Sequence, residues 1–436
     1  MLFYSDQNSP RLLYMLDLVS NEIFNEPFAQ ISDREIFISH GGPKLNYSAE
    51  RLSDCEFFIR PHGLLFENGI REQSITRFDF SGKAAFFGTP GDFPFDIFAA
   101  AFFLVSRYEE YLSFQPDKYG RFHHQASLAF RENFLDLPLI NYWLEDFKTA
   151  LRRKFPDLIF RLKDFKFIPS YDIDIAYSYK YKGLKRNLGG FCRSIIQGNW
   201  YYLLDRWDVL FNKKKDPFDS YEWLDSLHLY CRTRAYYFFL LAKKQGGVDK
   251  NISPDKPEMQ SLIRYHASGY TVGIHPSWQS GDEEAVLMAE TDTLEAITGS
   301  PVKYSRQHYL RMTMPQTYRR LIDLGIEKDF SLGYGASNGF RASITSSYYW
   351  YDLKAERKTR LMLFPFCFMD ANSFYENRLS PKAAFAELMD YYRKIKQVNG
   401  LMVTIWHNQF FGTDPMFAGW KEVYEVFLKD QIYWDM

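Results

Sequence analysis

Short apolar strands alternate with helical segments over residues 160–436, and this alternation constrains the fold more than any other feature. Strands are expected at 165–171, 235–241, 271–275, 302–306, 327–331, 361–369 and 402–406. Helices are expected between most of them, at 221–231, 257–268, 282–298, 315–324 and 381–398. Such alternation favours a parallel sheet with right-handed crossovers. About seven strands predict an α/β fold, a distorted or incomplete seven-stranded (β/α) barrel.

Four of the expected strands end in polar side chains that can bind a metal. Their sequences are IPSYDID, YTVGIHPS, VKYSRQH and LMVTIWHN, which contain Asp172, Asp174, His275, Arg306, His308 and His407. A parallel barrel gathers the carboxyl ends of its strands around one mouth, where catalytic residues collect. Two carboxylates and three histidines at one mouth indicate metal-assisted hydrolysis.

The two aspartates stand two positions apart on one expected strand. Their side chains therefore project from the same face, within about 7 Å of each other. One carboxylate can bind a metal while the other accepts a proton from water. Arg306 can hold Asp172 by a bidentate ion pair, and His407 can protonate a leaving amine. Helix capping or arginine binding stays open as an alternative for the pair, because D-x-D alone is weakly specific.

Together these motifs resemble the polysaccharide deacetylase (NodB-homology) superfamily, the family-4 carbohydrate esterases. The resemblance implies a distorted seven-stranded barrel that uses a divalent metal, here expected to be zinc, to remove N-acetyl or O-acetyl groups from sugars. It implies that Asp172 is the catalytic base and Asp174 a metal ligand, although the family's two aspartates are usually adjacent. Arg306 matches the arginine beside the base, and His407 matches the general acid. Asp370, in FCFMD, is the expected carboxylate that tunes His407.

The family's second motif, H-x-x-x-H, is only partly present in this chain. His275 takes its first position as a metal ligand, but the second position is Gln279. Catalytic zinc usually has three protein ligands and a water. His308 can supply the third ligand, whereas Gln279 is a poorer ligand that can orient water. If neither serves, the expectation is a non-catalytic glycan-binding or scaffolding protein; an amidase acting on a non-sugar amide is a further alternative.

The chain is predicted to divide near residue 155, with a smaller α/β domain at 1–155 and the barrel at 160–436. In the first part, helices are expected at 11–24, 95–112 and 139–155, and strands at 34–39 and 56–59. The strings YEEYL, DKYGRF, NISPDKPE, GIHPSW, SRQHYLR, SLGY and GFRAS resemble a bacterial subgroup of the superfamily that carries such an N-terminal domain. No phosphate-binding loop or dinucleotide-binding motif occurs in residues 1–155, so their role is not assigned.

Residues 176–218 are too long for a simple crossover between the first two barrel strands. The segment is basic and interleaved with aromatic residues. An amphipathic helix of this kind can lie on an anionic membrane or contact a lipid-linked glycan. The alternative is a solvated helical insertion that covers the barrel mouth.

Charge and composition exclude several classes of protein. A net charge of -1 over 436 residues argues against a nucleic-acid partner, so the expected partner is an acetylated sugar or glycan. The four cysteines form no C-x-x-C pair, which argues against a disulfide framework or a zinc ribbon. The first residues lack the pattern of a signal peptide, and no apolar run is long enough to span a bilayer. A cytoplasmic location is therefore expected.

Overall fold

The larger of two main sheets lies in the C-terminal part of the chain. The computed structural model describes residues 1–244 and 246–432. Hydrogen-bonded neighbours in the sheet follow the order β12-β13-β11-β10-β9-β8-β7-β15-β14, and the pairs are parallel except β12 with β13. The strands are β7 Lys166–Ile173, β8 Tyr236–Leu240, β9 Thr271–His275, β10 Tyr304–Ser305, β11 Lys328–Asp329, β12 Tyr348–Asp352, β13 Arg357–Leu363, β14 Phe368–Met369 and β15 Leu401–His407.

The segment that contains β13 and β14 connects the two ends of the run of parallel strands. The sequence predicts a single strand at 361–369, but the structure has two strands, β13 and β14, with Pro365 between them. Proline has no N–H to donate to a ladder, so the strand breaks there. β13 pairs with β11 at one end of the series, and β14 pairs with β15 at the other. The main sheet therefore holds nine described strands rather than about seven, the antiparallel β12 being the second addition.

Alternate residues of the strands face two different apolar cores. In β8, Phe238 belongs to a small cluster, whereas Tyr237 and Phe239 belong to the main core. In β15, Val403 and Ile405 likewise join the small cluster. This alternation follows from the period of two along a strand. The small cluster packs on one face of the sheet, and helices pack on the other.

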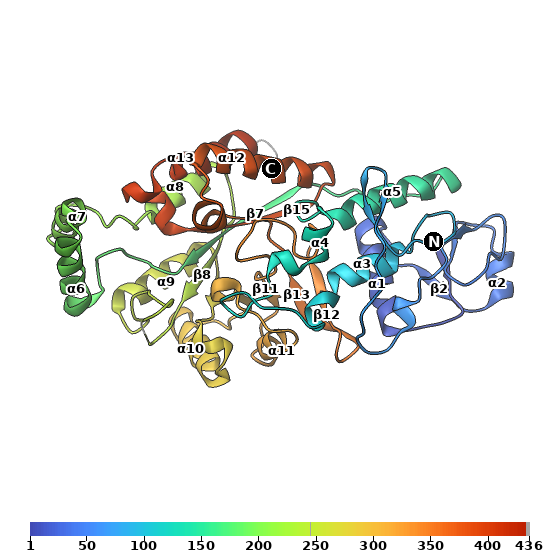
Figure 1. The fold of residues 1–436 in the computed structure, drawn as a ribbon, viewed down its shortest axis with the longest axis horizontal. Helices are drawn as coiled ribbons and strands as arrows, with labels where there is room; N and C mark the ends of the chain where they lie inside the picture. The colour runs from blue at the N-terminus through green and yellow to red at the C-terminus, as the bar shows by residue number, and fades with distance from the viewer. Residues whose placement is uncertain (245, 433–436) are drawn as a thin grey trace.

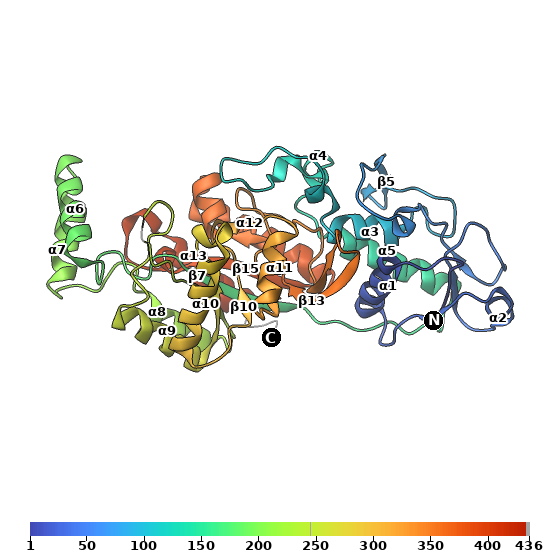
Figure 2. The ribbon, with the colours of Figure 1, turned by 90° about the horizontal axis from the view of Figure 1, so that it is seen from below.

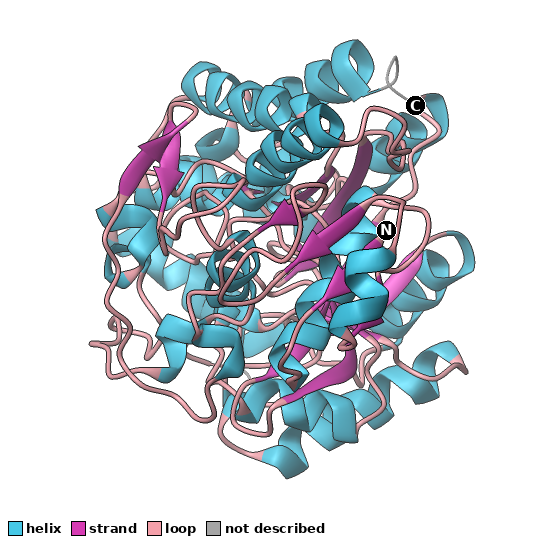
Figure 3. Cartoon of the chain, turned by 90° about the vertical axis from the view of Figure 1, so that its right-hand side faces the viewer, coloured by secondary structure: helices cyan, strands magenta, loops and turns pink. Residues whose placement is uncertain are grey.

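The helices that connect the strands lie around them (Figure 3). Five begin and end close to the predicted positions: α8 Tyr221–Tyr230, α9 Pro257–Gly269, α10 Glu284–Thr298, α11 Gln316–Asp323 and α12 Pro381–Gln397. A further helix, α13 Trp420–Phe427, was not predicted. The local signals explain this agreement. In α12, the Ser380 hydroxyl accepts a hydrogen bond from the N–H of Ala383, and Pro381 occupies the first turn. Its residues Leu388 and Ile395 are buried on one face.

A smaller parallel sheet, in the order β2-β1-β3-β4, forms near the N-terminus, at the right of Figure 1. Its strands are β1 Leu2–Tyr4, β2 Ala29–Ile31, β3 Lys44–Asn46 and β4 Phe57–Phe58, and β5 Phe78–Phe80 pairs with β6 Lys83–Ala85 in a hairpin. The helices of this part are α1 Pro10–Ile23, α2 Arg34–Ser39, α3 Ile97–Val105, α4 Leu128–Arg131 and α5 Leu139–Lys154.

The strands β1, β2 and β3 and the β5–β6 hairpin were not predicted, and two predicted elements of the N-terminal part differ in the structure. The strand expected at 34–39 is the helix α2, because Asp33 caps it by accepting a hydrogen bond from the N–H of Ile36 at 3.0 Å. The helix expected at 95–112 ends as α3 at Val105. Arg107 then takes a left-handed backbone conformation, with φ 55°, and a 3₁₀ turn, η2 Tyr108–Tyr111, follows. A buried ion pair between Arg107 and Glu110, at 2.7 Å, accompanies this break in the helix.

The N-terminal part packs directly against the edge of the main sheet. α1 lies against β13, and the Tyr14 ring is 4.9 Å from the Tyr351 ring. The Tyr14 hydroxyl donates to the Tyr349 carbonyl at 2.8 Å. Residues of both parts belong to one continuous apolar core. Their relative position is therefore set by packing rather than by the linker alone.

The segment 176–218 forms two helices, α6 Gly183–Ile196 and α7 Trp200–Leu210. They make an antiparallel hairpin that stands apart from the body at the end of the molecule opposite the N-terminal sheet (Figures 1 and 2). Among the described residues, no helix combines the length and apolar character needed to cross a bilayer.

Candidate metal centre and catalytic residues

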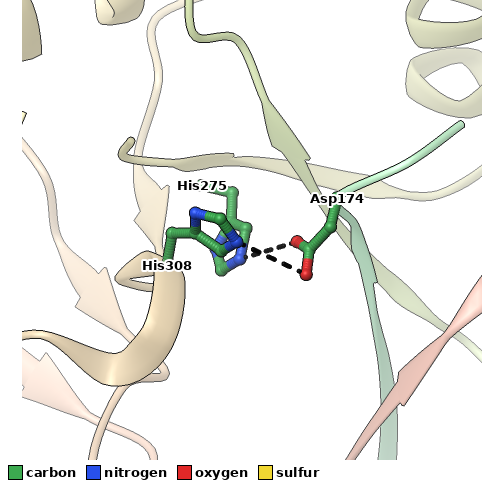
Figure 4. A group of neighbouring side chains, drawn as sticks. All are labelled: Asp174, His275 and His308. Carbon is green, nitrogen blue, oxygen red and sulfur yellow. Dashed lines mark ion pairs between the residues drawn. The ribbon is translucent and has the colours of Figure 1, made fainter. Parts of the chain in front are cut away.

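Asp174, His275 and His308 converge at the carboxyl ends of neighbouring strands (Figure 4). Asp174 directly follows β7, His275 ends β9, and His308 begins a 3₁₀ turn, η5 His308–Leu310, just after β10. Nε2 of His275 lies 3.1 Å from Asp174 Oδ1, and Nε2 of His308 lies 3.5 Å from Asp174 Oδ2. The ligand atoms of the three side chains all lie within 4.8 Å of one another.

The second nitrogen of each imidazole is held by the protein. Nδ1 of His275 is 2.5 Å from the Arg306 carbonyl oxygen, and Nδ1 of His308 is 2.8 Å from Asp249 Oδ1. Acceptors at both Nδ1 atoms assign the proton there, so each Nε2 directs a lone pair toward Asp174 in the neutral form. This is the arrangement of metal-binding histidines, whose other N–H donates to a carbonyl or carboxylate. Asp249 has no spacing signal in the sequence and was not predicted.

The three side chains fit a borderline divalent cation. One carboxylate oxygen and two imidazole nitrogens are a catalytic zinc set that leaves a position for water. Asp174 Oδ1 is buried and has no hydrogen-bond partner among the described residues, although it faces His275 Nε2. A buried carboxylate oxygen without a donor is costly unless a cation satisfies it. The residues present therefore suit a metal.

The charges within this cluster act strongly on one another. Burial alone would raise the pKa of Asp174, but the imidazoles of His308 and His275 outweigh it and hold that pKa well below its usual value. Burial would lower the pKa of His308, but Asp174 and then Asp249 raise it to about 9. The ionised Asp174 thus stabilises positive charge on the neighbouring imidazole of His308.

Asp172 is held beside the cluster by a buried arginine. Arg306 Nη1 donates to Asp172 Oδ1 at 2.7 Å, while Nη2 donates to the Ser170 hydroxyl at 2.6 Å. The pair is therefore single rather than the bidentate pair expected from sequence, because Ser170 takes the second nitrogen. The other carboxylate oxygen of Asp172, Oδ2, lies 3.8 Å from His275 Nε2.

His407 and Asp370 form a buried pair at the ends of β15 and β14. His407 Nδ1 is 2.6 Å from Asp370 Oδ1, and its backbone N–H donates to Asp370 Oδ2 at 2.7 Å. Burial would lower the pKa of His407, but Asp370 raises it to about 10. Nε2 of His407 is turned toward the cluster, 3.5 Å from Asp174 Oδ2.

These side chains open onto a cavity of about 460 Å³. Of the residues singled out in the sequence, its wall contains Asp172, Asp174, His275, His308 and His407. Arg306 and Asp370 are buried behind Asp172 and His407 as positioning residues. Gln279 begins a separate 3₁₀ turn, η4 Gln279–Gly281, and is not among the residues that line the cavity. Its role as a ligand stays a prediction.

A segment of the N-terminal part completes the cavity wall. Tyr119 and Arg121 line the cavity, and Arg121 Nη1 donates to the Tyr309 carbonyl at 2.8 Å. A Cβ at Gly335 would stand 1.9 Å from Arg121 Nη1, so only glycine allows this close approach. The Tyr119 ring lies 5.1 Å from the Tyr309 ring. The sequence marked DKYGRF as a string of resemblance, not as part of the site.

Two further features of the cavity wall were not predicted from the sequence. Tyr309 has a left-handed backbone, with φ 58°, directly after His308. Such strain persists only where surrounding contacts enforce it and is common at functional sites. Gln307 is buried and lines the cavity, and its Nε2 has no hydrogen-bond partner within the described part of the chain. It is free to donate to a bound molecule.

Comparison with known proteins gives one family match and several matches to solved structures. A protein-family profile described as "Family of unknown function (DUF7033)" matches residues 1–156. No curated protein matches significantly. Several solved structures match, and three of them are described here. The first is a candidate polysaccharide deacetylase from Mycobacterium smegmatis, with 13% sequence identity and a TM-score of 0.40; the match covers 62% of this chain and 84% of the deacetylase chain.

The other two are a polysaccharide deacetylase from Bacillus cereus and a mutant of a CE4 family pseudoenzyme with restored activity. Each is 12% identical to this chain, with a TM-score of 0.29, and each match covers 62% of this chain. The match covers 89% of the Bacillus cereus deacetylase and 64% of the pseudoenzyme mutant.

Proposed function

We propose that this protein is a metal-dependent deacetylase that removes an N-acetyl or O-acetyl group from a sugar of a polysaccharide or glycan precursor. One observation carries the proposal: a carboxylate held by Arg306 and an imidazole held by Asp370 both face the Asp174–His275–His308 cluster within one cavity. Acyl hydrolysis needs a base for water, an acid for the leaving group and an electrophile between them. We take the sheet, bridged by β13 and β14, as a distorted seven-stranded barrel with a separate domain ahead of it.

Each group of residues around the cavity has a separate role in the proposed reaction. Asp174, His275 and His308 would hold the cation, most simply zinc, which when bound polarises the acyl carbonyl and makes water more acidic. Asp172 accepts the proton of the attacking water through Oδ2, because its Oδ1 is bound by Arg306, which Ser170 holds in turn. His407 donates a proton to the departing nitrogen or oxygen. The Gln307 amide is placed to donate a hydrogen bond to the substrate.

Aromatic side chains support a sugar as the substrate. Tyr119, Tyr309 and Tyr375 line the cavity around the charged residues. Aromatic faces pack well against the apolar faces of sugar rings, and a cavity of about 460 Å³ lies in the range of small-molecule sites. The polar side chains of the lining can then recognise the hydroxyl and amide groups of an acetylated sugar.

Metal content is the first test. We expect about one equivalent of zinc or a similar metal in the purified protein by elemental analysis, because three ligands plus water complete a catalytic site. His308→Ala should lose it, whereas Gln279→Ala should retain it, since Gln279 lies outside the cavity. A wild-type protein that takes up no metal on reconstitution would contradict the proposed enzyme and favour a glycan-binding role.

Acetate release from a panel of N-acetylated and O-acetylated sugars tests the activity itself. Asp172→Asn should lower turnover by about a thousandfold while metal content stays unchanged, since it removes the base but none of the ligands. Asp164→Asn, at a residue outside the cavity wall, is the matched control and should behave as wild type. Undiminished turnover of Asp172→Asn would remove Asp172 as the base.

A further inference from the structure

The hairpin α6–α7 exposes its apolar residues and buries polar ones. The side chains of Leu184, Leu188, Ile195, Ile196, Trp200, Leu204, Trp207 and Phe211 are exposed by 47–84%. The buried residues of the two helices are Asn187, Ser194, Asp205 and Val209. A soluble helix normally shows the reverse pattern. The hairpin therefore presents an apolar surface that no described part of the chain covers.

The exposed residues form one stripe on each helix. In α6 the stripe is formed by the exposed Leu184, Leu188 and Ile195 together with the part-buried Phe191. In α7 it is formed by Trp200, Leu204 and Trp207 and continues to Phe211, which directly follows the helix. Spacings of four, three and four residues place each set on a single helix face. The rings of Phe191 and Trp207 lie 6.5 Å apart, so the two stripes meet.

The polar contacts between the helices fix the orientation of these stripes. Arg206 Nη1 donates to Asn187 Oδ1 at 3.0 Å, and the Arg206 guanidinium lies 4.5 Å from the Tyr179 ring. A Cβ at Gly190 would stand 2.4 Å from Arg206, so glycine lets this side chain pass between the helices. Because the polar side chains meet between the helices, the apolar stripes cannot turn inward without breaking these contacts.

The charge around the stripes is strongly positive. Residues 183–215 contain seven lysine or arginine residues and two aspartates, in a chain whose net charge is -1. Lys185 and Arg193 are exposed on α6, and Lys213 follows Phe211 with 65% of its side chain exposed. Lys213 is only loosely paired, 4.0 Å from Asp208. Positive charge is thus concentrated at the end of the molecule that carries the apolar stripes.

We propose that the α6–α7 hairpin docks on the surface of an anionic lipid bilayer. An exposed apolar stripe rich in tryptophan and flanked by basic residues inserts into the headgroup region, and anionic lipids attract the basic flank. A second copy of this chain would bring two positive hairpins together, which like charges oppose. Arg186 donates to the carbonyls of Lys250 and Asn251, at 2.6 and 3.0 Å, and so ties the hairpin to a loop that lines the cavity. The docking does not depend on the proposed activity.

Co-sedimentation with vesicles tests this proposal on the full chain. The wild type should sediment with phosphatidylcholine vesicles that contain phosphatidylglycerol and not with phosphatidylcholine alone, and added salt should weaken the binding. Trp200→Ser combined with Leu204→Ser should weaken it by about tenfold or more, because two inserted side chains are lost. Lys185→Gln combined with Lys213→Gln should weaken it on the anionic vesicles.

The control replaces apolar residues outside the hairpin that are even more exposed. Leu162 and Leu229 are exposed by 94% and 82%, and Leu162→Ser with Leu229→Ser should bind as wild type. Unchanged melting temperatures would show that the hairpin variants are folded. The proposal is overturned if the wild type ignores anionic vesicles, if the hairpin and control variants bind equally, or if light scattering shows a dimer that Trp200→Ser with Leu204→Ser dissociates.

Discussion

At the scale of single residues, Asp249 determines how His308 faces the other ligands. It is buried, its Oδ1 accepts from His308 Nδ1 at 2.8 Å, and the same atom accepts from the Trp278 backbone N–H at 3.2 Å. A carboxylate behind a metal-binding histidine fixes the tautomer and raises the basicity of the ring. Asp249 therefore serves the candidate centre without lining the position of the metal.

Asp249→Asn should weaken zinc affinity by roughly 10–100-fold, the usual effect of changing a group behind a ligand. A neutral amide can still accept from His308 but attracts the ring proton less strongly. Competition with a chromophoric chelator measures the affinity. Asp255→Asn, at an exposed residue of the same loop, is the control and should bind as wild type. Equal affinities for both variants would show that Asp249 has only a structural role.

At the scale of elements, the segment between η2 and α4 links the N-terminal part to the cavity. Its residues Tyr119 and Arg121 line the cavity from outside the main sheet. Asp117 holds Arg121 through an ion pair at 2.7 Å, and Arg121 reaches the backbone of Tyr309 beyond it. The N-terminal part thus contributes to the candidate substrate site although it supplies none of the candidate metal ligands.

Tyr119→Ala should raise KM about three- to tenfold and leave kcat nearly unchanged, since an aromatic contact of about 0.5–1.5 kcal/mol is lost far from the reacting bond. Steady-state kinetics with the acetylated sugar that the wild type hydrolyses would measure both constants. Tyr349→Ala removes a part-exposed tyrosine from β12, outside the cavity, and should leave KM unchanged. A loss confined to kcat in Tyr119→Ala would contradict a role in binding.

At the scale of the whole molecule, a buried ion network joins the two parts of the chain. Glu110 accepts from Arg341 Nε and Nη2 at 2.8 and 2.7 Å, and from Arg107 Nε at 2.7 Å. Arg341 lies in the segment between β11 and β12, and all three side chains are buried. Burial would raise the pKa of Glu110, but Arg341 and then Arg107 outweigh it and lower the pKa to about 2.

The lowered pKa makes the stability of the folded protein depend on pH. The stabilisation is fully present above the unfolded-state value of 4.5 and is lost as pH falls toward about 2. Glu110→Gln should therefore destabilise the protein at neutral pH by about 3 kcal/mol, and the difference from wild type should shrink between about pH 5 and pH 2. Thermal unfolding across this range measures it. Glu72→Gln, at an exposed residue, should show no such dependence, and a constant difference for Glu110→Gln would refute the assignment.

Most helices and strands of the C-terminal part follow from local signals. The alternation of apolar strands with capped amphipathic helices predicted α8, α9 and α12 to within a few residues, because hydrophobic period and capping act over short distances. The errors have equally local causes. Pro365 splits one predicted strand, Asp33 turns another into α2, and Arg107 ends α3 early.

The order of residues along the chain was enough to propose which polar groups form the site, since a parallel sheet gathers its strand ends at one edge. Asp172, Asp174, His275, His308 and His407 were all named in this way and meet in one cavity. Asp249, Gln307 and Tyr119 emerge only from the arrangement in space. They come from loops or a distant part of the chain, where no periodic pattern constrains side-chain direction and long-range packing alone sets each contact.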